Sequence, residues 1–258
     1  MYRLRRASCK YLLLPCRGAV SSVEDGMAVN EHHFCMLLES NSETDTVHTG
    51  TRTRGFVLEA KRWSPREEIT IRFLEGDPVL RQRVTDVANE WLDHADLIFR
   101  FVDAAPSDIR IAFIPGAGSW SYLGTDARHI DEPKPTMNYG WLTANSDDDE
   151  VRRVVLHEFG HALGMIHEHQ NPLGGVQWNQ AAVIADLGGP PNNWSMQTIE
   201  NNMFRKYDPA EGIGTQFDGE SIMLYPIPAA WTTDGFSSGL NDRLSEDDKL
   251  LIEQIYPK

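Results

Sequence analysis

The chain of 258 residues contains little cysteine, and none after Cys35. Its three cysteines are Cys9, Cys16 and Cys35, so an internal disulfide framework is impossible in the body of the chain. Long apolar runs are also missing, since the longest early one is Tyr11–Leu14 and a membrane-spanning helix needs roughly 20 apolar residues. The sequence therefore predicts neither a disulfide-stapled scaffold nor a membrane span.

Positive charge is scarce as well, because 24 Lys and Arg stand against 38 Asp and Glu, for a net charge of −14. A nucleic-acid partner is excluded, since phosphate binding depends on Lys and Arg. Internal repeats are absent, which excludes solenoids and propellers. With 41% hydrophobic residues, the chain can bury a sizeable core in one large domain or two small ones.

The first 55 residues differ in composition from the rest. From Glu39 to Arg54 the chain reads ESNSETDTVHTGTRTR, with Val47 as its only aliphatic residue. Such a segment cannot offset its ordering entropy by burial, so we expect a largely disordered tail or linker over 1–55 and an ordered domain over 56–258. The basic start resembles a targeting signal, but Pro15 cuts the apolar stretch short of the core that a secretory signal requires.

Within this tail, His32, His33 and Cys35 form a short cluster of metal-binding residue types. One hypothesis is an inhibitory pro-segment, because a thiolate can bind at the open position of a zinc site. A short cluster of this kind in a polar tail is usually incidental, and the sequence favours that second interpretation.

The remainder predicts an α+β fold in which helices back a mixed sheet. We expect strands at 69–74, 97–102, 108–113 and 136–142, and a glycine-rich loop at 116–124. A helix is predicted to begin at Asp77-Pro78, with an apolar stripe formed by Val79, Val84, Val87, Ala88, Trp91 and Leu92. A second helix should begin at Ser146, with Asp149 as its capping partner, and end at Gly164.

The second helix carries the residues that can bind a metal and catalyse a reaction. His157 and His161 are four residues apart, so both imidazoles can reach one ion, and Glu158 beside them can act as a general base toward water. Gly164 then allows the chain to turn back and bring His167 to the same ion. Three protein ligands with an open fourth position are typical of a catalytic zinc site.

The motif HEFGHALGMIH resembles that of the metzincin metallopeptidases, and Ser221–Tyr225 is similar to their methionine turn, with Met223 packing beneath the metal. Glu168 and Tyr225 point to the astacin-like branch. Over 56–258, this resemblance implies a twisted sheet with a backing helix and an active-site helix, and a smaller irregular C-terminal subdomain with a capped final helix. It also implies that Tyr225 is a displaceable zinc ligand that helps to stabilise the oxyanion.

The resemblance further implies an extracellular zinc endopeptidase that acts on proteins or peptides, and we expect a monomer. The chain departs from the family pattern at Gln170-Asn171-Pro172 and Leu224, and it lacks the usual disulfides. The resemblance favours residues Thr136–Trp141 as the edge strand that pairs with an extended substrate, whereas the sequence alone is equally consistent with an ordinary strand. His169 is interpreted as structural or as lining the pocket.

Two alternatives stay open at this point. A non-catalytic zinc module could capture protein segments in the same cleft, although such a module would usually have lost the base that Glu158 supplies. A metzincin similar to the matrixins would share HEFGHALG, but Glu168 and Tyr225 argue against it.

Overall fold

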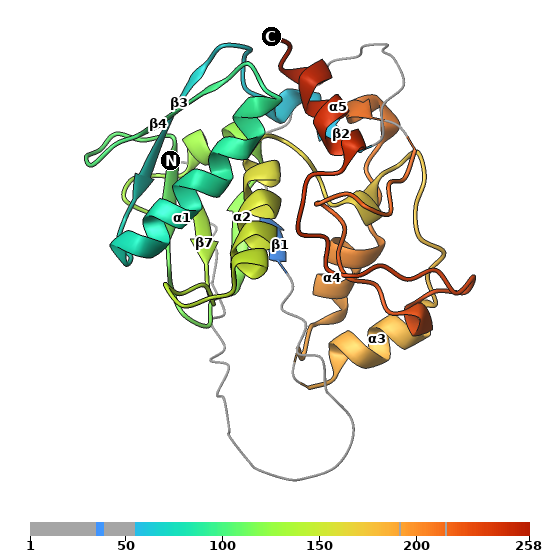
Figure 1. Cartoon of the computed structure of the whole chain (residues 1–258). Coiled ribbons are helices and arrows are strands. Elements are labelled where there is room, and N and C mark those ends of the chain that lie inside the picture. Colours follow the sequence, from blue (N-terminus) through green and yellow to red (C-terminus); the bar gives the residue numbers. More distant parts are fainter. Residues whose placement is uncertain (1–34, 39–54, 191, 215) are drawn as a thin grey trace, which may run out of the picture. The chain divides into compact units, whose positions relative to one another are not determined.

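The computed structural model describes residues 35–38 and 55–258, except 191 and 215, and all of these belong to one compact unit that spans 31–258. Figure 1 shows its helices and strands. Over this described part, no helix has the length and apolar character needed to cross a membrane.

A six-stranded sheet with the order β1-β6-β7-β5-β3-β4 forms the first half of this unit. Neighbouring strands are parallel except for β6 and β7, which are antiparallel. The strands are β1 (Cys35–Leu38), β3 (Glu68–Phe73), β4 (Ile98–Phe101), β5 (Ile109–Ala112), β6 (Ser119–Tyr122) and β7 (Met137–Tyr139). The predicted mixed sheet is confirmed.

Helices α1 (Pro78–Ala88) and α2 (Asp148–Ala162) lie side by side (Figure 1) and share one apolar core with the sheet. Asp77 caps α1 by accepting from the backbone N–H groups of Val79 and Leu80, as the sequence predicts. Helix α2 is capped by Asp147 rather than Ser146, whose hydroxyl instead accepts from the backbone N–H of Thr143. The start of α2 was therefore predicted one residue too early.

The C-terminal half has fewer regular elements and a second apolar core. It contains α3 (Gln180–Gly188), α4 (Met196–Ile199), the π-helical turn η5 (Glu200–Phe204) and α5 (Glu246–Ile255). Strands β2 (Phe56–Leu58) and β8 (Gly212–Gly214) pair antiparallel and join the two halves. The short 3-10 helices are η1 (Glu59–Lys61), η2 (Asn89–Asp93), η3 (Gly124–His129), η4 (Glu168–Gln170), η6 (Pro209–Glu211) and η7 (Ala229–Trp231).

Helix α5 confirms the expected capped final helix: it begins with a capping box of Ser245 and Asp248 and packs back into the first core. At its end, Tyr256 is fully buried, and its hydroxyl accepts from the backbone N–H of Trp63 and donates to the carbonyl of Leu163. This contact fastens the C-terminal end of α2 to the last turn of the fold.

The sheet corrects two predictions. Residues 119–122, within the expected loop 116–124, form strand β6, and β7 lies inside the sheet between β6 and β5. The prediction of an edge strand at 136–141 is therefore wrong, because β7 has a neighbouring strand on each side. In β6 the buried residues are the serines Ser119 and Ser121, whereas an ordinary half-buried strand buries its apolar residues. The hydropathy pattern therefore did not predict this strand.

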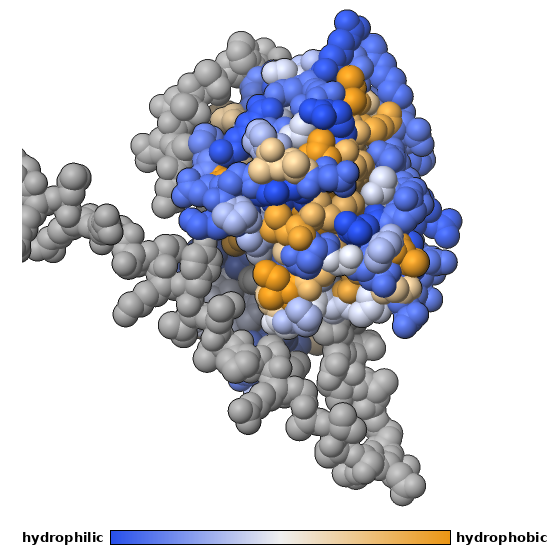
Figure 2. Space-filling model, turned by 90° about the vertical axis from the view of Figure 1, so that its left-hand side faces the viewer, coloured by the Kyte–Doolittle hydropathy of each residue, from blue (hydrophilic) through white to orange (hydrophobic). Residues whose placement is uncertain are grey.

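The predicted apolar stripe of α1 is wrong at Val79, which is 59% exposed, whereas its neighbour Leu80 is buried in its place. Figure 2 shows one face of the molecule, where apolar surface forms a broken band between hydrophilic residues. In the predicted tail, Cys35–Leu38 form strand β1, so order extends further toward the N-terminus than expected. The remainder of 1–54 lies outside the described residues.

Candidate active site

Helix α2 delivers three of the predicted site residues from its buried C-terminal half. His157, Glu158 and His161 are all buried there. Gly164 then adopts a φ of +96°, a left-handed conformation that favours glycine, and the chain turns back to bring His167 opposite the helix. The predicted geometry of the motif is confirmed.

Each imidazole is oriented by a hydrogen bond at Nδ1. His157 Nδ1 lies 2.8 Å from the carbonyl of Ile222, and His161 Nδ1 lies 2.7 Å from the carbonyl of Met165. Because a carbonyl oxygen only accepts, these Nδ1 atoms carry the hydrogen and the Nε2 atoms carry lone pairs. Burial also lowers the pKa of His161 to about 4 and that of His157 well below its usual range, so both rings are neutral.

The imidazole of His167 is also oriented by a hydrogen bond at Nδ1, but its partner is a side chain. His167 Nδ1 lies 3.2 Å from Oε1 of Gln170, while Nε2 of Gln170 donates to the carbonyl of Asn201 at 2.8 Å. The second contact fixes the orientation of the amide, because only its NH₂ group can face a carbonyl. Oε1 must then face His167 and accept its Nδ1 hydrogen. Burial lowers the pKa of His167 well below its usual range.

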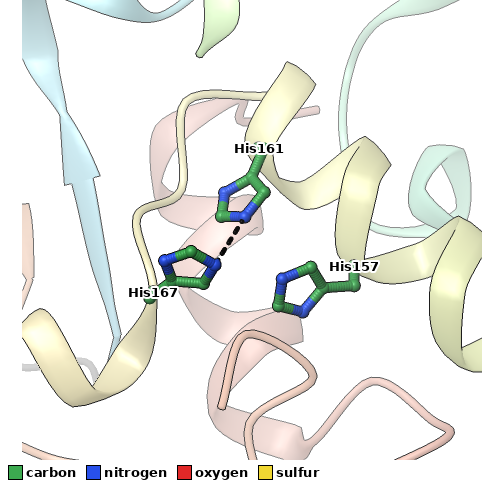
Figure 3. A group of neighbouring side chains, drawn as sticks. All are labelled: His157, His161 and His167. Atoms are coloured by element: carbon green, nitrogen blue, oxygen red, sulfur yellow. Dashed lines mark hydrogen bonds between the residues drawn. The ribbon is translucent and has the colours of Figure 1, made fainter. Parts of the chain in front are cut away.

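The three rings converge as a zinc site requires (Figure 3). One nitrogen from each of His157, His161 and His167 lies within 4.8 Å of the others, and the Nε2 atoms of His161 and His167 are 3.1 Å apart. Both of these Nε2 atoms face each other with lone pairs, which favours a cation shared between them. Ligands about 2.1 Å from a tetrahedral ion would be roughly 3.4 Å apart, so the residues fit zinc.

Glu158 follows His157 on α2 and is fully buried. Its neighbour is the Cys35 thiol, and its oxygens have no other hydrogen-bond partner within the described residues. Burial raises its pKa to about 8. A buried carboxylate with a raised pKa is suited to take up a proton near neutral pH, which is the property that a general base needs.

Tyr225 lies against the rings from the turn after Met223. Its ring centroid is 4.3 Å from that of His167 and 6.1 Å from that of His157. The phenol donates a hydrogen bond to the backbone carbonyl of Cys35. The structure thus brings Tyr225 to the predicted site, and its role as a zinc ligand stays a prediction.

Cys35 is a site residue that the sequence interpretation dismissed. Strand β1 pairs in parallel with β6, with Cys35 opposite Ser119, and the Cys35 side chain is buried beside Glu158. Burial, and next the Glu158 carboxylate, raise the pKa of the Cys35 thiol. The structure therefore places Cys35 at the site, and the inhibitory hypothesis stays a prediction, while His32 and His33 lie outside the described residues.

A small cavity lies next to His157. Its volume is about 10 Å³, enough for no more than one water molecule. Its walls include Cys35, Arg153, His157, Leu224 and Tyr225. Cys35 of the N-terminal strand therefore lines the space beside one of the predicted zinc ligands.

Two further site residues escaped the sequence analysis. Tyr139 on β7 is buried with an unpartnered hydroxyl, and its pKa is raised by burial and then by Glu158. Arg153 lies one turn before His157 and is paired with Glu150 at 2.7 Å. The helical period of four residues between Arg153 and His157 was a usable indication that they share a face.

Met223 packs against α2, where Gly160 makes room for it. A Cβ added at Gly160 would lie 2.3 Å from Sδ of Met223 and 3.4 Å from Trp91. We expect Gly160→Ala to lower the free energy of unfolding by about 1–3 kcal/mol, the usual cost of overpacking a core. Chemical denaturation measures this. Gly188→Ala is the control, since its Cβ would meet only the carbonyl of Trp194 at 4.0 Å; an equal loss in both variants would contradict the prediction.

Three neutral imidazoles, a buried carboxylate and a methionine turn define the site of a metzincin-type zinc metallopeptidase. The model of the Astacin peptidase family matches residues 56–250, and the chain belongs to this family. The predicted family, α+β fold, zinc cofactor and endopeptidase class are thereby confirmed, and the matrixin-like alternative is set aside.

Solved structures and curated relatives agree with this assignment. The structure of myroilysin has 43% identity and a TM-score of 0.78, and the match covers 79% of this chain and 99% of that one. A hatching enzyme zinc-protease from the medaka Oryzias latipes, with 18% identity, a TM-score of 0.50 and coverage of 76% and 94%, shares the fold. Zinc metalloproteinase nas-38 of Caenorhabditis elegans is 30% identical over 64% of this chain. The match spans only 20% of that protein's own length.

Proposed function

We propose that this chain is a zinc-dependent endopeptidase whose active site is held closed by its own N-terminal segment. The observation that carries the peptidase assignment is the buried Glu158 carboxylate, which follows the first of three neutral histidines whose ring nitrogens converge. A buried carboxylate costs free energy unless it is paired or used, so its presence there indicates chemistry rather than packing.

His157, His161 and His167 would hold the zinc ion. When bound, the ion supplies a Lewis acid that makes a water molecule more acidic and polarises a carbonyl group. Glu158 takes the proton from the attacking water and delivers it to the leaving amine. The hydroxyl of Tyr225 donates to the carbonyl of Cys35 in this structure, and during catalysis it would donate instead to the oxyanion that develops on the scissile carbonyl.

Three contacts support the closure of the site. Strand β1 occupies the free side of β6, which an extended peptide would otherwise use for backbone pairing. The backbone carbonyl of Cys35 accepts a hydrogen bond from the hydroxyl of Tyr225, and the side chain of Cys35 lies beside Glu158. A thiolate is also a good zinc ligand, so Cys35 is chemically suited to block the open metal position.

The alternative function, a non-catalytic module that captures protein segments, is disfavoured by the same carboxylate. A binding module has no use for a buried carboxylate at this position. Turnover separates the two functions, because a module binds its partner once whereas an enzyme releases products repeatedly.

The test uses the full-length chain with Cys35→Ala, loaded with zinc and incubated with denatured casein in large excess. We expect many cuts per enzyme molecule at internal peptide bonds, identified by mass spectrometry, and loss of cleavage with a chelator until zinc is restored. Stoichiometric binding of casein without products would instead support the binding module.

Two finer expectations belong to this proposal. The chain is secreted, an expectation supported by the family resemblance, and it acts as a monomer. Recovery of the protein from the culture medium of its source cells tests the first, and light scattering after size-exclusion chromatography tests the second.

A further inference from the structure

The π-helical turn η5 ends with two backbone carbonyls that point to the zinc-binding motif. Arg205 donates to Glu200, closing the π-helical hydrogen bond, and the backbone then becomes extended at Arg205. The last carbonyls of a helix have no partner within it, so Asn201 and Asn202 must find donors elsewhere. Both receive them from side chains of the segment that follows His167.

Gln170 connects the first of these carbonyls to a zinc ligand. Its Nε2 donates to Asn201 at 2.8 Å, and its Oε1 accepts from Nδ1 of His167 at 3.2 Å. Gln170 is buried, so its amide has no water to turn toward. The side chain therefore acts as a rigid link between η5 and the third imidazole.

His169 binds the neighbouring carbonyl and supports the same ring from its face. Its Nε2 lies 2.7 Å from the carbonyl of Asn202. Its ring stacks on His167 with centroids 5.2 Å apart and a 19° interplanar angle, and it lies 4.7 Å from the ring of Tyr225. Consecutive side chains thus dock on consecutive carbonyls, which fixes the backbone on which Gln170 stands.

We propose that Gln170 is a positioning residue that sets the orientation and ligand strength of His167 by accepting the hydrogen of its Nδ1. The other two histidines are held by backbone carbonyls from nearby loops, whereas His167 depends on a side chain. This inference rests on the proposed zinc function. An acceptor at Nδ1 makes an imidazole a better ligand, and loss of such partners typically costs 10–100-fold in metal affinity.

The test compares two substitutions in the full-length chain. Gln170→Met removes both hydrogen bonds at similar volume, whereas Gln170→Glu keeps an acceptor for His167 and loses only the donor to Asn201. We expect zinc affinity, measured by competition with a chromogenic chelator, to fall about 10–100-fold in Gln170→Met and to change less than about threefold in Gln170→Glu. The visible spectrum of the Co²⁺-substituted protein should shift in the Met variant alone.

Gln197→Met is the matched control, since Gln197 donates to the side chain of Asn201 on the same turn but is exposed and touches no histidine. Unchanged zinc affinity in Gln170→Met overturns the inference. A tenfold loss of zinc affinity in Gln170→Glu overturns it as well. This second outcome can be measured even if the Gln170→Met variant does not fold. Failure of the native chain to bind zinc at all would instead reject the proposed function.

Discussion

Glu158→Gln, made in the zinc-loaded Cys35→Ala chain, is expected to lower kcat for casein or a peptide by about 10²–10⁴-fold, the usual contribution of a general base. The amide keeps the shape of the side chain and cannot accept the proton of the attacking water. Zinc content should stay at one ion per chain, because the three histidines are held by partners other than Glu158. Initial rates together with metal analysis measure both quantities.

The same change of charge at Glu253 is the control, since this residue is on the exposed side of α5 and pairs with His94. Glu253→Gln should leave kcat unchanged. A Glu158→Gln chain that retains more than about a tenth of the native rate would show that the proton goes elsewhere.

Cys35→Ala in the full-length chain is expected to raise the initial rate of peptide hydrolysis by at least about tenfold, which corresponds to about 1.4 kcal/mol. The substitution removes the thiol beside Glu158 and keeps the backbone of β1, so the strand loses a side-chain contact in the site and becomes easier to displace. A fluorogenic peptide assay on freshly purified protein measures the change.

Leu37→Ala is the companion variant, because Leu37 is on the same strand and packs in a separate apolar cluster. It weakens β1 without touching the thiol, so a smaller gain than with Cys35→Ala is expected. Equal activity of the native and Cys35→Ala chains would contradict the proposal that Cys35 holds the site closed.

The sequence was sufficient for the parts of the site that lie close together in the chain. His157, His161 and His167 are related by one helical turn and one glycine bend, so local geometry decides their convergence. The caps at Asp77 and Ser245 were likewise predictable, since each bonds within three residues.

Long-range pairing was not predictable in the same way. Strand β1 pairs with β6 across more than 80 residues of chain, and the polar stretch between Glu39 and Arg54 gives no indication of it. In β6 the small serines face inward, with Gly140 donating to the hydroxyl of Ser119, so hydropathy alternation has the opposite sense from an ordinary half-buried strand. The position of β7 inside the sheet could not be predicted without strand β6.

The contact between Tyr256 and Leu163 has a consequence for the order of events during translation. The residue that fastens the end of α2 is made 93 residues after Leu163. At 5–20 residues per second, the ribosome needs roughly 5–20 s to make this stretch. Cys35 is made before either, so the segment that forms β1 is already present when the active-site helix is secured. Under the proposed closure by β1, a cell making this chain would be protected from its proteolysis from the first moment that the site can form.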